Sequence, residues 1–335
     1  MECTFAWVGM DHSSRREFLR SVAAPFAAAL LPAGAAFAQA YPERPIRLVV
    51  GYPAGGGADR LARVLAIQLG TELGQSIVVE NRPGATGTIA AAGVARSPAD
   101  GYTLLLSETG MIAGSILHPS GYDAVKSFSV VTSIGSLAFS IICAPSFPAQ
   151  TVPQLIAYLK ANPGKISFGS PGNGNVAHLA AVQFQRKTGT LMNHIPYKGG
   201  APMLTDLAGG QFPIAFISAS AAEALAKSGR VRYLALTSAQ KLSNLPDVPT
   251  VAATVPGFDV SSNLFLLAPA GTPRSIVETL HAAVAKAVSN PAMATEFQSQ
   301  GATIRISPPE AAQRAMAAEA VELAALIREE KIQGD

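Results

Sequence analysis

The sequence predicts two similar α/β lobes, each built on a mostly parallel sheet with helices on both faces. Two observations predict this fold class. Short β-branched runs alternate with glycine-rich loops and with segments whose apolar residues follow helical spacing. This unit of strand, loop and helix recurs within 46–110 and again, in the same order, within 166–218. Such alternation is typical of parallel strands that are connected by helices.

The first set of units opens with Ile46–Val50, a run typical of a strand that is buried on both faces. Further strands, loops and helices follow in regular order. The strands are 46–50, 77–79 and 102–106, the loops after them 51–59, 81–87 and 107–110, and the helices 61–69 and 88–95.

The second set repeats this order, and helices close the chain. Its strands are 166–168, 194–196 and 213–216, the loops after them 169–175, 197–202 and 217–218, and the helices 176–185 and 203–208. The closing helices are predicted at 273–288, 291–301 and 308–331. Pro309 and Glu310 are a helix-entry signal for the last of them.

Two apolar segments, 139–144 and 262–268, are predicted to cross between the lobes. We therefore expect lobe 1 to comprise 41–142 with 262–335, including the C-terminal helices, and lobe 2 to comprise 143–261. Ligands bind at the carboxyl ends of the strands in open α/β sheets. Two such edges that face each other form a cleft.

The N-terminal segment 1–40 is predicted to be a twin-arginine export signal. Arg15 and Arg16 precede the apolar run 22–31, which has about half the ~20 residues of a membrane span. A small-x-small cleavage pattern follows at 36–38. We therefore expect a periplasmic protein that begins near Gln39 or Tyr41, with Met1 and Met10 both open as start sites.

Composition narrows the function classes. Hydrophobic residues make up 49% and charged residues 14% of the chain, which predicts a globular protein. The net charge of +3 includes no basic run that would indicate nucleic-acid binding. Cys3 leaves with the signal, so Cys143 remains alone and is predicted to be a buried structural thiol. We expect no membrane span in the mature part, no lipid anchor and a monomer.

The loop 52–59 is the most distinctive candidate for ligand binding, with Tyr52, Ala54, Gly55, Gly56 and Asp59 as predicted site residues. Glycines let the backbone approach a ligand closely, and the next helix offers free N–H groups and its positive dipole end. Asp59 either takes part in the site or caps the helix. A purely structural turn is the alternative.

The same loop raises the alternative of an exported nucleotide-cofactor oxidoreductase. A strand, a glycine-rich turn, a helix and a strand ending at Glu80 have the layout of a dinucleotide-binding unit. However, Arg60 stands where the third glycine of that fingerprint belongs, and its side chain would obstruct the close packing of helix and strand.

The remaining candidate residues are mostly neutral hydrogen-bonding groups at strand ends. They are Ser107, Thr109, Ser170, Asn173, Gly174, Asn175, Tyr197, Lys198, Gly199 and Ser218. Asparagines and Ser170 can cap a helix or hold a carboxylate, and Lys198 faces either the cleft or solvent. His178 and His194 are expected to be structural.

No catalytic, metal or cofactor site is predicted. The histidines 118, 178, 194 and 281 lack metal-binding spacing, and no nucleophile-elbow or phosphate-loop motif occurs. A cleft that is rich in neutral donors and poor in acid–base groups is suited to binding a ligand and releasing it unchanged. The sequence therefore favours a non-enzymatic binding protein.

These residues resemble the Bug-type extracytoplasmic solute receptors, which are the substrate-binding proteins of tripartite tricarboxylate transporters. The resemblance covers essentially the whole mature chain in order. It rests on the segments 41–50, 53–59, 79–85, 100–105, 196–199, 245–250 and 267–273.

The resemblance implies a periplasmic, type II-like Venus flytrap that closes on a small carboxylate by hinge motion. In such receptors the loop matching 52–59 holds the carboxylate, partly through waters, and the loops at 107–109, 170–175, 197–199 and 218 meet the distal end. The family also implies a membrane permease as partner. Whether a cognate permease exists stays open, as does a role as the ligand-presenting subunit of a periplasmic sensor.

This chain departs from the family pattern at Glu108, where a small or neutral residue is common, and at Ile217-Ser218, where Asp-Asn is more usual. If Glu108 faces the cleft, it disfavours a second carboxylate and could favour an amine or amide. If it points away, it has no bearing on specificity. The sequence alone does not decide between these.

Overall fold

The computed structural model describes residues 41–334, so the predicted export signal lies outside the described residues. The fold described below is that of the compact unit Arg44–Asp335. None of the helices in the described part is long and apolar enough to cross a membrane.

The first sheet contains the first predicted strand set. β1 (Ile46–Val50) lies between β2 (Ile77–Asn81) and β3 (Thr103–Glu108) and is parallel to both. β9 (Ser261–Pro269) then pairs antiparallel with β3, β4 (Phe128–Cys143) with β9, and β10 (Ala302–Ser307) with β4. The sheet is therefore mixed, with its parallel part limited to the repeated unit.

The second sheet repeats this arrangement. β5 (Ser167–Ser170) lies between β6 (Asn193–Pro196) and β7 (Ile214–Ser218) and is parallel to both. The order β6-β5-β7 thus matches β2-β1-β3, which agrees with the duplicated organisation predicted from the sequence. β4 pairs antiparallel with β7 and with β8 (Arg232–Leu236).

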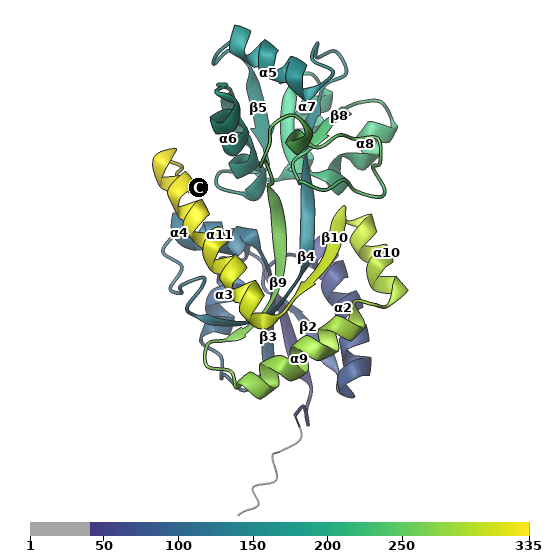
Figure 1. Cartoon of the computed structure of the whole chain (residues 1–335), viewed down its shortest axis with the longest axis vertical. Coiled ribbons are helices and arrows are strands. Elements are labelled where there is room, and N and C mark those ends of the chain that lie inside the picture. The colour runs from purple at the N-terminus through teal and green to yellow at the C-terminus, as the bar shows by residue number, and fades with distance from the viewer. Residues whose placement is uncertain (1–40, 335) are drawn as a thin grey trace, which may run out of the picture. The chain divides into compact units, whose positions relative to one another are not determined.

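β4 belongs to both sheets. Its residues up to Ala138 pair with β9, and those from Phe139 pair with β7. Figure 1 shows β4 and β9 running side by side between the two groups of elements, which we call the first lobe and the second lobe after the two sheets. β4 contains all but the last residue of the predicted crossing segment 139–144, and β9 contains the predicted segment 262–268. The boundaries between residues 142 and 143 and between 261 and 262 stay a prediction.

Helices flank both sheets and connect the parallel strands. They are α2 (Gly57–Leu73), α3 (Thr88–Ala95), α4 (Thr109–Leu117), α5 (Val152–Ala161), α6 (Val176–Thr188), α7 (Gly200–Ala208), α8 (Glu223–Lys227), α9 (Arg274–Ala287), α10 (Pro291–Ser299) and α11 (Pro309–Glu329). Short 3₁₀ turns form at Ala85–Gly87 (η1), Ala219–Ala222 (η2) and Val251–Ala253 (η3).

The local sequence patterns did not predict α4, α5, α8, β8 or β10. α4 is buried along Thr109–Gly114 and apolar on nearly every side, so it lacks the polar stripe that marks a surface helix. α5 does carry a readable start signal, because the Thr151 side chain accepts a hydrogen bond from Gln154 N and a proline occupies the first turn.

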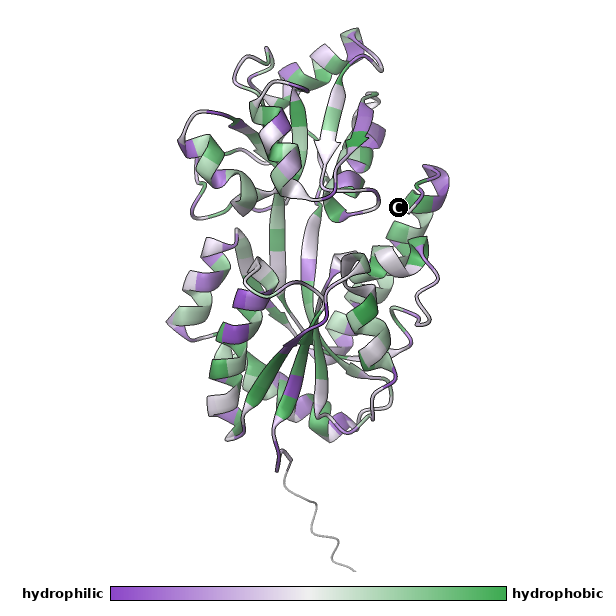
Figure 2. Ribbon diagram, turned by 180° about the vertical axis from the view of Figure 1, so that it is seen from behind, coloured by the Kyte–Doolittle hydropathy of each residue, from purple (hydrophilic) through white to green (hydrophobic). Residues whose placement is uncertain are grey.

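Each lobe has its own apolar core. Phe168, Phe184, Phe216 and Phe258 pack together in the second lobe, and Val49, Leu105, Phe265 and Leu267 belong to the core of the first. Figure 2 shows the hydrophobic residues concentrated along the strands and the inner faces of the helices. Cys143 is fully buried in the second-lobe core, as predicted, and burial raises its pKa to about 11.

We predict that Gly135→Ala weakens the junction of β4 and β10. A Cβ atom at Gly135 would collide with the backbone carbonyl oxygen of Thr303 on β10. Because backbone cannot move aside as a side chain can, the variant should lose roughly 1–3 kcal/mol of unfolding free energy in urea titrations.

Gly93→Ala is the matched control. Gly93 lies within α3, and a Cβ there would meet only the guanidinium end of Arg82 at 3.0 Å. Alanine also favours the helix over glycine, so this variant should be neutral or stabilised. Equal stability of the two variants would contradict the predicted clash.

Candidate functional site

The loops after β1, β2 and β3 converge at one end of the first sheet. The register pairs Val50 with Leu106, so the loop that begins at Gly51 starts beside Ser107. A Cβ at Gly51 would lie 2.6 Å from the Cα of Gly87, which shows how closely the loops after β1 and β2 approach. Only glycine permits this contact between backbones.

Asp59 organises the glycine loop from within. It is 2% exposed, and its carboxylate accepts hydrogen bonds from Gly55 N (2.8 Å), Arg63 Nε (2.9 Å) and Asn81 Nδ2 (2.9 Å). The bond from Arg63 is the main cause that lowers the pKa of Asp59 to about 2. Gly56 is the N-cap of α2, so Asp59 acts from inside the first turn by reaching back to the loop. These contacts leave it no exposed surface for a ligand.

Glu108 stands at the carboxyl end of β3 and is partly exposed. Its Oε2 accepts a hydrogen bond from Ser262 Oγ on β9 at 3.4 Å, and its side chain also bonds the Tyr52 hydroxyl. Burial raises the pKa of Glu108 to about 7, and burial together with Glu108 raises that of Tyr52 well above its usual value. Within the described part of the chain, no Lys or Arg forms an ion pair with Glu108.

A second polar cluster ties α4 and α11 to the crossing strand β9. Thr109 Oγ1 donates to Glu319 Oε1 at 2.6 Å and accepts from Asn263 N at 2.8 Å, while Asn263 Nδ2 donates to Glu319 Oε2 at 3.0 Å. Burial raises the pKa of Glu319. Thr109 and Ser107 are buried, so they pack inside the protein at the end of β3 and do not face solvent. Glu319 and Asn263 were not predicted, because nothing in their local sequence links them to Thr109.

In the second lobe, the loop after β5 is held by internal hydrogen bonds. Ser170 is fully buried, and its Oγ lies 2.7 Å from His194 Nε2 and donates to Gly172 O at 3.0 Å. Asn175 caps α6 by accepting from His178 N at 3.0 Å, and Gly174 N donates to His178 Nδ1 at 3.0 Å. The Ser170 hydroxyl therefore holds the conformation of this loop through hydrogen bonds within the protein.

The two histidines form a stacked pair behind this loop. The ring centroids of His178 and His194 are 3.9 Å apart, with an interplanar angle of 9° between the rings. His194 also stacks on Phe168. Burial, together with His194, lowers the pKa of His178 to about 3. These contacts agree with the structural role predicted for both residues.

The loop after β6 exposes backbone groups and the cationic side chain of Lys198. Tyr197 turns its hydroxyl to Asp206 Oδ2 on α7 at 2.8 Å, and burial with this bond raises its pKa to about 12. Lys198 is exposed, and Gly199, with φ of 111°, begins α7. Ser218 ends β7 just before η2, where it is partly exposed.

The two lobes also touch directly on the α4, α6 and α11 side. A Cβ at Gly174 would collide with Leu117 of α4, and Arg186 Nη1 on α6 pairs with Glu329 Oε2 on α11 at 2.6 Å. Leu179 and Val182 of α6 pack with Leu326 of α11. In Figure 1, α11 extends from the first lobe towards α6.

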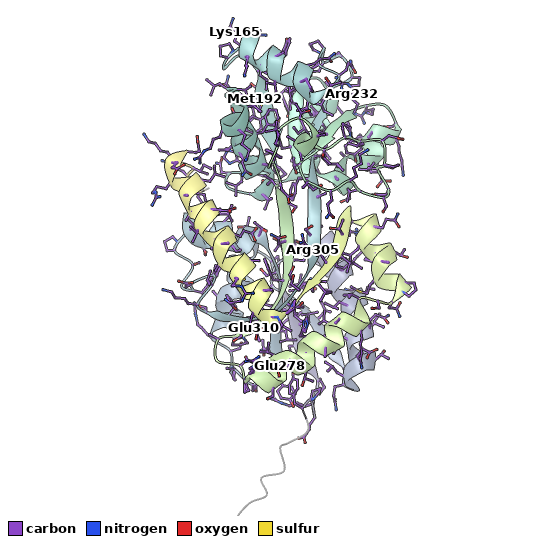
Figure 3. All side chains as sticks on the ribbon, viewed as in Figure 1. Lys165, Met192, Arg232, Glu278, Arg305 and Glu310 are labelled. Atoms are coloured by element: carbon purple, nitrogen blue, oxygen red, sulfur yellow. The ribbon has the colours of Figure 1, made fainter. Side chains whose placement is uncertain are left out.

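Two hollows open beside the crossing strands. One of about 770 Å³ lies between α6 and α11 and reaches Thr109, Asn263 and Glu319. The other, of about 240 Å³, is lined by residues of both lobes and by Arg305 of β10, which Figure 3 shows near the waist of the molecule. Neither is lined by Tyr52 or Glu108.

The predicted site residues thus fall into two groups. Those with internal positions are Asp59, Ser107, Thr109, Ser170 and Gly174. Those with exposed or partly exposed surface are Tyr52, Ala54, Gly55, Gly56, Asn173, Asn175, Tyr197, Lys198, Gly199 and Ser218. Among the residues that the structure describes, no group of three or more His, Cys, Asp or Glu side chains could hold a metal ion.

Comparison with known proteins gives consistent matches. Residues 61–331 match the family model of the tripartite tricarboxylate transporter family receptor. The chain is 37% identical to Protein BugT of Bordetella pertussis over 296 residues, covering 87% of this chain and 91% of that protein.

Solved structures of the same kind align over most of the chain. Rpa4515 of R. palustris with adipate has a TM-score of 0.75 at 34% identity, over 88% of this chain and 100% of that one. MatC of Rhodopseudomonas palustris with bound malate has a TM-score of 0.69 at 27% identity, over 86% of this chain and 100% of that one.

We predict that Asp59→Ala destabilises the protein because it leaves three donors without their acceptor. The unfolding free energy measured at neutral pH should fall by roughly 1–3 kcal/mol. Asp247→Ala, at an exposed aspartate, is the control and should change little. If the two variants were equally stable, Asp59 would not organise the loop.

We predict that His178 makes stability depend on pH. Its folded pKa of about 3 lies below the usual 6.5, so the unfolded chain binds the proton more readily, and stability falls as pH drops below 6.5. Between about pH 7 and pH 5 the loss should be about 2 kcal/mol.

The raised pKa values of Glu108 and Glu319 act in the opposite direction over the same pH range, so the test is the difference between the variant and the wild type. In urea titrations, His178→Gln should gain about 2 kcal/mol of unfolding free energy relative to the wild type as the pH falls from about 7 to about 5. His118→Gln leaves His178 and its contacts in place and should keep the wild-type slope. An unchanged slope in His178→Gln would contradict the assignment.

Proposed function

This chain belongs to the tripartite tricarboxylate transporter receptor family, and we propose that it is a periplasmic solute-binding receptor that captures a small organic carboxylate between its two lobes. The observation that carries the proposal is the pairing of two equivalent strand sets, β2-β1-β3 and β6-β5-β7, joined by β4 and β9. Ligands bind at the carboxyl ends of such strands.

Backbone N–H groups are the proposed anchor for the ligand carboxylate. α2 and α7 begin after Gly56 and Gly199, and neither helix has a side-chain hydrogen bond at its N-cap. The first N–H groups of a helix have no partner within the helix and carry the positive end of its dipole. An anion that approaches over exposed glycines can therefore be bound without a buried cation.

The proposed ligand contacts come from the partly exposed members of the predicted set. These are Tyr52, Ala54, Gly55, Gly56, Asn173, Asn175, Lys198, Gly199 and Ser218. Asp59, Ser107, Thr109, Ser170, Gly174 and the Tyr197 hydroxyl are proposed to hold the loops in place, since their polar groups are buried or bonded within the protein. The related proteins with adipate and malate support a small carboxylate as the ligand class.

Hinge closure about β4 and β9 is the proposed mechanism. A ligand that contacts both lobes binds the closed arrangement better and shifts the population towards it. We expect a dissociation constant near the micromolar range, which corresponds to a binding free energy of about −8 kcal/mol. The proposed contact residues include no paired acid and base, which supports release of the ligand unchanged.

We further propose export through the twin-arginine signal and delivery to a membrane permease of the tripartite tricarboxylate type. A periplasmic sensor would use the same cleft with a different partner. The oxidoreductase alternative is less well supported, since Arg60 stands where the third fingerprint glycine belongs. Its exposed side chain donates to Gly55 O and pairs with Glu296.

The test is calorimetric titration and thermal shift of residues 41–335 with mono-, di- and tricarboxylates, amino acids, aromatic acids and nicotinamide dinucleotides. One class of carboxylate should raise the melting temperature, because binding to the folded state stabilises it. X-ray scattering should show a smaller radius of gyration with that ligand. A response to dinucleotides alone would overturn the proposal.

A further inference from the structure

Glu108 is the acidic group at the interlobe end of the first sheet. It ends β3, which lies between β1 and β9, and it bonds one side chain from each neighbour: the hydroxyl of Tyr52, which follows β1, and that of Ser262 on β9. Its side chain stays partly exposed between them. Glu108 thus joins the glycine-loop side of the site to a crossing strand.

Among the described residues, no cationic side chain interacts with Glu108. The titratable side chain that hydrogen-bonds it is the phenol of Tyr52, and Tyr122 interacts electrostatically with Tyr52. On the other side Glu319 of α11, linked through Thr109, adds a second carboxyl. Burying a carboxylate without a cation is costly, which is why its pKa rises towards neutrality.

Glu108 also occupies a helix start where an anion could otherwise bind. It is the N-cap residue of α4, and its side chain makes no capping hydrogen bond. Its carboxyl therefore adds negative charge at the end of the helix that would favour a ligand anion. α2 and α7 begin instead with glycine.

We propose that Glu108 determines specificity: it accepts hydrogen bonds from a protonated amine, or from an amide, at one end of the ligand and rejects a second carboxylate there. This inference rests on the proposed function. A carboxylate has about four acceptor positions, of which the two hydroxyls use two, so N–H donors can fill the rest. An ammonium group also supplies the missing positive charge, whereas a second carboxylate requires a shared proton or meets repulsion.

Three ligand pairs test the proposal, because each replaces one carboxylate by an ammonium group on the same carbon chain. They are succinate with β-alanine, glutarate with γ-aminobutyrate, and adipate with δ-aminovalerate. Calorimetry at slightly alkaline pH should show the amino acid binding at least about tenfold tighter than its dicarboxylate for the chain length that fits best.

Glu108→Gln should remove or reverse this preference, since glutamine keeps partners for Ser262 and Tyr52 but carries no charge. Glu278→Gln, at an exposed glutamate of α9, is the control. It removes one carboxylate charge from the first lobe away from the strand ends and should leave the ratio of the two affinities unchanged. Acidification below neutral pH should reduce the preference in the wild type and leave it unchanged in Glu108→Gln, a response that a purely structural role would not produce.

Three results separate the possible failures. A wild type that prefers the dicarboxylate overturns the inference, as does an unchanged ratio in Glu108→Gln. In either case carboxylate binding itself still supports the receptor function. Absence of binding by every carboxylate, in both the wild type and Glu108→Gln, overturns the proposed function and the inference with it.

Discussion

The continuous pairing of β4 is the constraint on which the rest of the structure depends. One strand of 16 residues takes part in both sheets, and β9 pairs antiparallel with its first-sheet part as far as Ala138, at the junction. The two strand sets are thereby linked through one continuous strand, as the proposed interlobe cleft requires. The pairing of β4 with β9 is interrupted near residue 131 and again near residue 134. Such bulges change the twist and direction of a strand without breaking it, and both lie within the first sheet, before β4 passes into the second.

Three acidic side chains near the carboxyl ends of the first-sheet strands differ in their hydrogen-bond partners and in what they connect. Asp59 is paired with Arg63 and holds the glycine loop. Glu319 receives two neutral hydrogen bonds and links α11 to β9. Glu108 also has only neutral partners, but they come from the loop after β1 and from β9. Its place at the end of β3, where the loops converge, distinguishes the proposed role in ligand selection from a supporting role.

Element type could be predicted where the local pattern carried the information. Ile46–Val50 and Thr88–Ala95 lie at the predicted residues, because a β-branched run and helical spacing are properties of a few neighbouring positions. α4 and β10 were missed for the converse reason. α4 is apolar on nearly every side, so it lacks the alternation of polar and apolar residues that marks a helix. β10 forms by pairing with the distant strand β4, which its local sequence does not reveal. Likewise, the candidate loops were found from glycine and proline, but their side-chain directions were not.

The sequence by itself determined the duplicated order of strands, loops and helices and the family resemblance, since both are written in local patterns and motifs. Only the tertiary structure decided which polar residues are consumed inside the protein. Ser170 and Thr109 looked like ligand donors, yet their hydroxyls bond His194 and Glu319, from segments 24 and 210 positions away. It also decided that Glu108 meets Tyr52 and Ser262. Such pairings depend on distant segments meeting across sheets, and no local pattern contains that information.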